Sequence, residues 1–114
     1  MSAEMDLDTL TREMYAFVES KGWLDGDSPK QQTSRNLAIS LALEASEVLE
    51  HFQWSEEAQQ PEALAEELAD VMLYLLQLAS LSGIDLGEAV MHKLRKNQSR
   101  DWAAPAGDDA PSGL

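Results

Sequence analysis

Hydrophobic positions recur every three or four residues through most of this chain, which is the spacing of amphipathic helices. Polar stretches separate four such segments, and the strict alternation typical of strands is not sustained anywhere. The predicted helices run from Leu7 to near Gly22, from Ser34 to about Gln53, from Pro61 to about Ser82 and from Asp85 to about Ser99. The pattern therefore predicts an all-α protein, an antiparallel four-helix bundle with short connections.

Local signals mark the ends of these helices. Ser34 is expected to be the N-cap of the second helix, Pro61 suits a first helical turn, and Gly83 suits the position just after a helix. Asp85 followed by Glu88 resembles a capping box. The polar stretch before the second helix, with its Gly and Pro, is predicted to be a loop.

Length and composition narrow the function classes. The 114 residues suit one domain, expected over residues 1–102, with a disordered tail at 103–114 that is rich in Pro, Gly and Asp. A net charge of −13 disfavours nucleic-acid polymers as partners, and the absence of Cys excludes disulfides and thiol chemistry. No apolar run reaches the ~20 residues of a membrane span. An acidic N-terminus is unlike a signal peptide, so a cytoplasmic protein without membrane partners is expected.

The third predicted helix is apolar on more than one face. Leu73, Leu76 and Leu78 lie beside its main apolar stripe. Since three partner helices in one small chain would leave part of this surface uncovered, the sequence predicts a homo-oligomer that assembles through its apolar helices.

Acidic residues interrupt the apolar stripes of the second and third helices. Counted at ~100° per residue from Leu37, Glu44 falls at about 340° and Glu47 at about 280°. On the third helix, counted from Leu64, Glu67 falls near 300° and Asp70 near 240°. If the helices face each other, four carboxylates form one cluster, whose mutual repulsion a divalent cation would relieve. Mg²⁺, or Mn²⁺, is the expected metal because both prefer oxygen ligands. A solvated acidic face is the alternative interpretation.

Further candidates are the polar residues in line on the fourth helix and the aromatic residues near the helix ends. Lys93, Asn97 and Arg100 suit phosphate oxygens, although cations also stabilise the end of a helix. Trp23, Trp54 and Tyr74 suit a nucleobase, although a Trp at a helix end is often a core residue. His51 is interpreted as an interior or interface histidine with a partner, rather than a metal ligand. No Glu stands three residues before either His, as a di-iron bundle requires.

Two segments carry a resemblance to a known family. NLAISLALEASEVLEHFQW at residues 36–54 and EELADVMLYLLQLASLSGIDLGEAVMHKLRKN at residues 66–97 resemble the MazG-like all-α nucleoside triphosphate pyrophosphohydrolases. The small dCTP pyrophosphatase-like branch is the most similar. The paired pattern E-x-x-E and E-x-x-D, with FQW and K-x-x-x-N, carries the likeness over roughly residues 5–102.

The resemblance implies a fold, a reaction and a site. Members split a nucleoside triphosphate into the monophosphate and pyrophosphate, and this branch is typically tetrameric, although a dimer stays possible for this chain. The implied metal ligands, which the family's catalysis requires, are Glu44, Glu47, Glu67 and Asp70. The implied substrate-binding residues are Lys93, Asn97 and Arg100 near the phosphates and Trp23, Trp54 and Tyr74 around the base.

The chain departs from the branch at three places, and other functions stay open. The loop over residues 23–36 is longer, Ser55 follows FQW where Lys is frequent, and Trp102 falls in the segment where Arg-Tyr-Pro is usual. The expected function is a Mg²⁺-dependent pyrophosphohydrolase, with deoxycytidine triphosphate favoured only by resemblance. The alternatives are a phosphoribosyl-ATP pyrophosphohydrolase, a dimeric dUTPase, and a non-enzymatic interaction module with a solvated acidic face.

Overall fold

The computed structural model describes residues 5–24, 26, 28 and 31–100, which form four α-helices and contain no strand. The helices are α1 Leu7–Ser20, α2 Ser34–Glu50, α3 Pro61–Leu81 and α4 Leu86–Gln98. This confirms the all-α class and the order of the four helices. The predicted tail at 103–114 and the residue Trp102 lie outside the described residues.

The end of α1 fixes where Trp23 lies. Gly22 adopts a positive φ of 73°, and the N–H of Trp23 then donates to the carbonyl of Val18 at 3.4 Å. This arrangement ends a helix by satisfying carbonyls of its last turn, and it favours Gly because a Cβ disfavours positive φ. The turn therefore holds Trp23 beside the last turn of α1 instead of letting it extend into the loop.

The N-cap of α2 differs from the sequence prediction. Thr33, and not Ser34, is the N-cap: its backbone is extended and its hydroxyl accepts the N–H of Asn36 at 3.1 Å. Ser34 is already helical, so the prediction was wrong by one residue. At the other end the helix stops at Glu50 and not near Gln53, because the next three N–H groups bond to carbonyls only three residues back.

The signals predicted for the last two helices are present. Pro61 opens α3, where its missing N–H costs nothing. Gly83 follows α3 with a φ of 70°, and Ile84 donates to the carbonyl of Ala79 at 2.8 Å. Asp85 is the N-cap of α4 and accepts the N–H of Glu88 at 3.1 Å.

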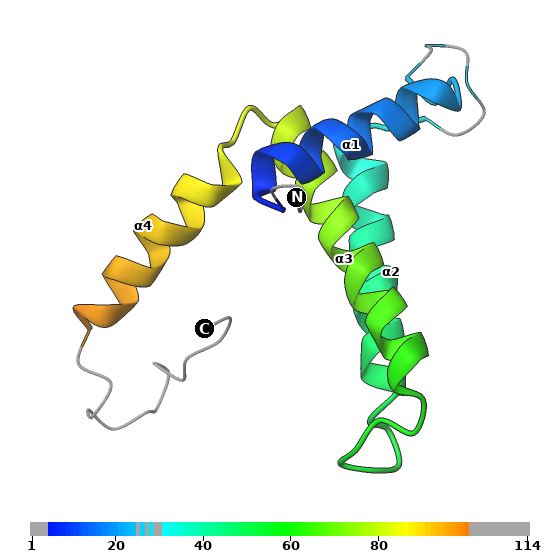
Figure 1. The fold of residues 1–114 in the computed structure, drawn as a ribbon, viewed down its shortest axis with the longest axis vertical. Coiled ribbons are helices and arrows are strands. Elements are labelled where there is room, and N and C mark those ends of the chain that lie inside the picture. Colours follow the sequence, from blue (N-terminus) through cyan, green and yellow to red (C-terminus); the bar gives the residue numbers. More distant parts are fainter. Residues whose placement is uncertain (1–4, 25, 27, 29–30, 101–114) are drawn as a thin grey trace. The chain divides into compact units, whose positions relative to one another are not determined.

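The chain divides into two compact units, Met1–Ile84 and Asp85–Leu114. Within the first unit α3 contacts both α2 and α1, and α2 and α3 run side by side in opposite directions while α1 crosses them (Figure 1). The buried apolar side chains there are Met14, Val18, Leu37, Leu76 and Ala79. The second unit contains α4 and is described by itself, so the packing of a fourth helix into a bundle stays a prediction.

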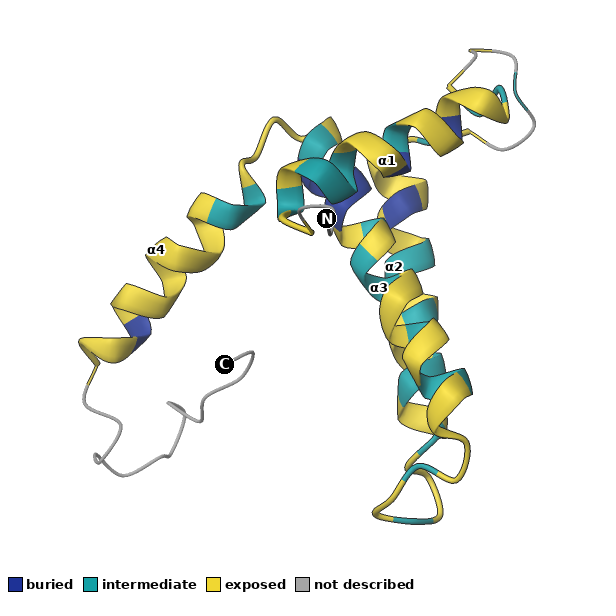
Figure 2. Cartoon of the chain, viewed as in Figure 1, coloured by how far each residue is buried: buried dark blue, intermediate teal, exposed yellow. Residues whose placement is uncertain are grey.

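Large apolar side chains are unusually exposed for a chain of this size. Figure 2 shows much of α2 and α3 coloured as exposed or half-buried. Leu43 on α2 is 60% exposed, Leu68 on α3 is 51% exposed, and Met91 on α4 is 47% exposed. Within the described part of the chain, no single helix is long and apolar enough to cross a membrane. The helices α3 and α4 reach the required length and apolar content only when they are taken together, and a break in the helix separates them.

Candidate active site

The side-by-side packing of α2 and α3 brings their acidic residues together. Desolvation first, then the charges of Asp70 and Glu67 and a hydrogen bond with Asp70, raise the pKa of Glu44. The charge of Glu44, followed by desolvation and a hydrogen bond with Glu67, raises the pKa of Glu47. Two carboxyl groups of α2 therefore contact two of α3, as the helical wheel predicted. The repulsion among them is the kind that a bound cation would relieve.

His51 adds a contact to this cluster that the sequence did not specify. Its Nε2 is paired with Oε2 of Glu67, so the residue that caps the end of α2 is bonded to α3. Only 13% of the His51 side chain is exposed. This agrees with the interpretation of His51 as a histidine with a partner. Since the bond engages one oxygen of Glu67, it fixes the direction in which the carboxylate points.

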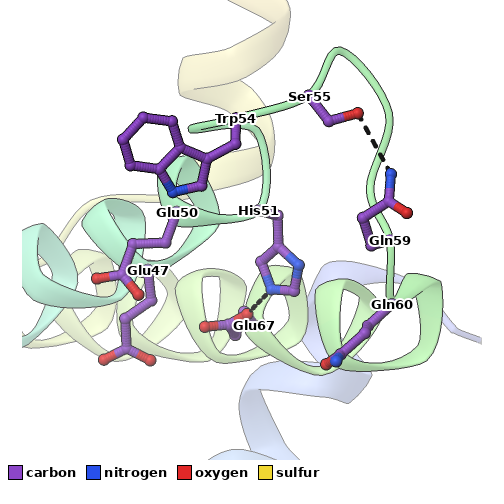
Figure 3. Close-up of a pocket in the computed structure, with 8 residues that line it drawn as sticks. All are labelled: Glu47, Glu50, His51, Trp54, Ser55, Gln59, Gln60 and Glu67. Atoms are coloured by element: carbon purple, nitrogen blue, oxygen red, sulfur yellow. Dashed lines mark hydrogen bonds and ion pairs between the residues drawn. The ribbon is translucent and has the colours of Figure 1, made fainter.

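A cavity of about 320 Å³ opens at the end of α2, and all its lining residues except Trp54 are of polar types (Figure 3). His51 and Glu67 point toward each other in it, and the indole of Trp54 lies on the same side as Glu50. Trp54 is 90% exposed in the single chain, so it forms an edge of the cavity and not its floor. The residues lining the cavity are Glu47, Glu50, His51, Trp54, Ser55, Gln59, Gln60 and Glu67.

A second cavity, of about 350 Å³, lies between α1, α3 and the segment before α2. It contains both Trp23 and Tyr74, two of the three aromatic residues predicted around a base. Trp23 meets Phe17 edge to face, with ring centroids 5.6 Å apart. Asp70 lines the same cavity, whereas Glu67, one turn earlier on α3, lines the first one. The carboxylate cluster therefore borders two cavities, one lined mostly by polar residue types and one mostly by apolar and aromatic ones.

The predicted phosphate-contacting residues belong to the second unit. Asn97 on α4 is buried, with 7% of its surface exposed, whereas Lys93 and Arg100 are exposed. These three residues are described within their own unit, and their relation to the carboxylates stays a prediction.

Sequence reasoning missed the polar residues of the second cavity. Gln32 and Gln77 both line it and are hydrogen-bonded to each other at 2.6 Å. Gln77 follows Asp70 by seven residues and Tyr74 by three, so all three share one face of α3. That spacing is the signal in the sequence, but an uncharged Gln77 does not stand out from the other residues of a helix.

The donor set suits a hard divalent cation, since it consists of carboxylate oxygens from two helices. As the side chains stand in the described residues, no three His, Asp or Glu groups converge on a point where a metal ion would be held. Glu44 contacts Asp70 and Glu47 contacts Glu67, so carboxylate oxygens of both helices lie close together. The residues present therefore fit such a cation in chemistry and neighbourhood.

Comparison with known protein families supplies the classification. The profile of the MazG-like family matches residues 39–109, which include most of α2 and all of α3 and α4. This chain belongs to the MazG-like family. The match includes all four acidic residues, Lys93 and Asn97 of α4, and Arg100 just after that helix.

Individual relatives agree with this membership. The chain is 35% identical over 108 residues to dCTP pyrophosphatase 1 of Rattus norvegicus, covering 87% of this chain and 61% of the relative. The chain thus spans about three fifths of the length of that curated relative. A shorter match, 49% identical over 37 residues, is to a dATP/dGTP diphosphohydrolase of Cyanophage S-2L, and it covers 32% of this chain and 35% of that protein.

A solved structure shares the MazG-like fold of this chain. A pyrophosphatase from Archaeoglobus fulgidus superimposes with a TM-score of 0.66 at 32% sequence identity, over 86% of this chain and 94% of that one.

Proposed function

We propose that this protein is a divalent-metal-dependent nucleoside triphosphate pyrophosphohydrolase, which releases pyrophosphate and a nucleoside monophosphate. The observation that carries the proposal is the contact of Glu44 and Glu47 on α2 with Glu67 and Asp70 on α3. Membership of the MazG-like family supports it, as do the names of the relatives, two of which are a dCTP pyrophosphatase and a dATP/dGTP diphosphohydrolase.

The four carboxylates are the proposed metal ligands, and Mg²⁺ is the proposed metal, with Mn²⁺ as a substitute. When bound, such a cation supplies charge neutralisation and polarises phosphate oxygens toward attack by water. Glu67 would be held in place for this by its bond with His51. Glu47 is the proposed group that orients or deprotonates the attacking water, because it lines the polar cavity beside Glu67.

The cavity containing Trp23 and Tyr74 is the proposed place of the nucleobase. A base stacked on an aromatic ring gains about 1–3 kcal/mol, and Trp23 is held at this cavity by the turn after α1. Trp54, at the other cavity, is the third proposed aromatic contact. A nucleotide would thus extend from the carboxylates toward the aromatic cavity, with Asp70 at the boundary.

Lys93 and Asn97 on α4, with Arg100 two residues after its end, are the proposed phosphate contacts. Their support is chemical, since two cations and an amide suit the charge that develops on a leaving pyrophosphate. Deoxycytidine triphosphate is the proposed preferred substrate because several similar proteins are named dCTP pyrophosphatase 1. The phage relative, named for dATP and dGTP, makes the preference a question for measurement.

A homo-oligomer, a tetramer in preference to a dimer, is the proposed assembly. The exposed Leu43, Leu68 and Met91 support it, because apolar side chains in such number on α2, α3 and α4 favour burial against another subunit. We place the protein in the cytoplasm, acting on free nucleotides and with neither nucleic acid polymers nor membranes as partners.

A panel of nucleoside triphosphates tests the function directly. Wild-type protein with Mg²⁺ is assayed for phosphate released after addition of inorganic pyrophosphatase. Glu47→Gln is expected to lower turnover by a factor of roughly 100 or more with unchanged circular dichroism. Glu66→Gln, an exposed acid of α3 outside both cavities, is the matched control and is expected to keep full activity. Lack of any nucleotide turnover by the wild type would instead favour the non-enzymatic module.

A further inference from the structure

One acidic side chain of the aromatic cavity has no part in the proposed chemistry. Glu13 of α1 lines this cavity together with Trp23 and Tyr74. The other carboxylate there, Asp70, is a proposed metal ligand. Within the described part of the chain, the Glu13 carboxylate forms no hydrogen bond or ion pair. Its oxygens are therefore available to accept from a ligand that enters the cavity.

The position of Glu13 on α1 places it on the wall of the cavity. Leu10 lies three residues before Glu13 and Phe17 four residues after it, and both line the same cavity. Residues at these spacings share one face of a helix. Met14 is the remaining cavity residue of α1, so the wall that this helix supplies is hydrophobic except for one carboxylate.

The same wall lies close to Trp23, on which the base is proposed to stack. Glu13 stands four residues before Phe17, which corresponds to about 6 Å along the helix at 1.5 Å per residue. The ring centroids of Phe17 and Trp23 are 5.6 Å apart. A base that lies against Trp23 is therefore about one helical turn from Glu13, and the side chain of Glu13 can approach its edge.

The chemistry of a carboxylate limits which base edge it can bind. An ionised carboxylate accepts hydrogen bonds but cannot donate one, so it repels a keto oxygen, which is also an acceptor. An exocyclic amino group does donate, and Glu or Asp is the usual acceptor for N4 of cytosine. The described residues that line the cavity include no Lys, Arg or His. Lys21 lies over the ring of Phe17, 5.6 Å from its centroid, but does not line the cavity.

We propose that Glu13 is a specificity-determining residue whose carboxylate accepts a hydrogen bond from the exocyclic amino group of the substrate's base. This inference rests on the proposed function and deepens it by naming the substrate class. The preferred bases are cytosine and adenine, which carry an amino group where uracil and hypoxanthine carry a keto oxygen. Discrimination is strong at such a contact, because the keto analogue loses a charge-assisted hydrogen bond and meets a repulsion in its place.

Two pairs of substrates that differ in this one group test the proposal. Wild type and Glu13→Gln are compared for kcat/KM on dCTP against dUTP and on dATP against dITP. Affinities for non-hydrolysable analogues of the four nucleotides are measured by calorimetry. Glutamine keeps the size of Glu13, but its amide can either donate or accept. We expect the preference for the amino-bearing base to fall roughly 10-fold or more in Glu13→Gln, in kcat/KM and in affinity. Cleavage of inorganic tripolyphosphate, which has no base, is expected to stay within about 2-fold of wild type.

Glu19→Gln is the matched control for the loss of one negative charge from α1. Glu19 is exposed on the same helix and does not line the cavity. It is expected to keep the base preference of the wild type. Because Glu13 and Glu19 are both exposed, neither substitution disturbs the core, and both variants are expected to fold.

The outcomes separate the role of Glu13 from the proposed function. An amino preference that is unchanged in Glu13→Gln would overturn the role of Glu13 alone, and so would an equal loss on all substrates, tripolyphosphate included. A wild type that cleaves the keto-bearing member of each pair as well as the amino-bearing one, or a preference that is also lost in Glu19→Gln, would have the same consequence. A wild type that neither binds nor cleaves any nucleotide would overturn the proposed function and this inference with it.

Discussion

Replacing Asp70 by Asn should make the metal-free protein more stable while abolishing its activity. The charge of Asp70 is one of the causes that raise the pKa of Glu44, so the two carboxylates repel each other when both are ionised. Asparagine removes that charge and keeps the shape and a hydrogen-bonding group. The substitution therefore removes a repulsion together with one of the proposed metal ligands.

The magnitude follows from the exposure of the two groups. Unit charges about 4 Å apart repel by about 1 kcal/mol in bulk water and about 4 kcal/mol near a protein surface. Asp70 is exposed and Glu44 half-buried, which favours the lower figure of about 1 kcal/mol. For a domain of this size, 1 kcal/mol raises the melting temperature by about 4–8 °C.

Thermal melts in EDTA at pH 7 measure the effect, with Glu66→Gln as the control for net charge. Asp70→Asn is expected to gain several degrees more than the control. Saturating Mn²⁺ at 100 times its dissociation constant should stabilise wild type by about 2.7 kcal/mol and leave Asp70→Asn unchanged. Equal melting temperatures for the two variants, or a Mn²⁺ shift that survives in Asp70→Asn, would refute the reasoning.

Three further outcomes follow from the same geometry. Leu37→Ala should lower the free energy of unfolding, measured by urea denaturation, by about 2.7–5 kcal/mol, because Leu37 is 2% exposed and its removal leaves a cavity that α2 cannot fill. A loss below about 1 kcal/mol would contradict the place of Leu37 in the core. The raised pKa values of Glu44 and Glu47 contribute stability that is fully present below pH 4.5 and is lost as the pH rises through the raised values. The melting temperature in EDTA should therefore fall between pH 5 and pH 7 in the wild type. It should fall less in the Glu44→Gln/Glu47→Gln double variant. His51→Leu should weaken Mn²⁺ binding in calorimetry by roughly 10-fold, with partial recovery in His51→Gln, because the bond to Glu67 orients that carboxylate; equal affinities would remove His51 from the site.

The sequence predicted the helices well because their signals are local. Periodicity, Pro61, Gly83 and the Asp85 cap each act within a few residues, and each is where the structure has it. The one displaced cap, at Thr33 in place of Ser34, shows the limit of this reasoning. Adjacent hydroxyl residues are equally good caps in a sequence, and only the backbone conformation decides between them.

The acidic pairs were predictable for a different reason. An acid in or beside an apolar stripe is costly, so the wheel positions of Glu44 and Glu67 predicted a carboxylate cluster on the condition that α2 and α3 face each other there. The cavities were beyond prediction, because they depend on how α1 crosses α3 and on the turn at Gly22 that holds Trp23. Neither the crossing of α1 and α3 nor the turn at Gly22 produces a periodic pattern in the sequence.

The residues that line the two cavities differ in how easily they can be recognised from the sequence. Charged groups reveal themselves in a sequence because burial penalises them strongly, whereas a neutral amide such as Gln77 is ordinary on any helix. What sets Gln77 apart is its partner, Gln32, which is 45 residues away in the sequence and is joined to it only by the fold. The charged residues that carry the chemistry of a family can therefore be predicted from the pattern of charges along its helices. A contact between two neutral side chains from distant segments, such as Gln77 and Gln32, is found only in the structure.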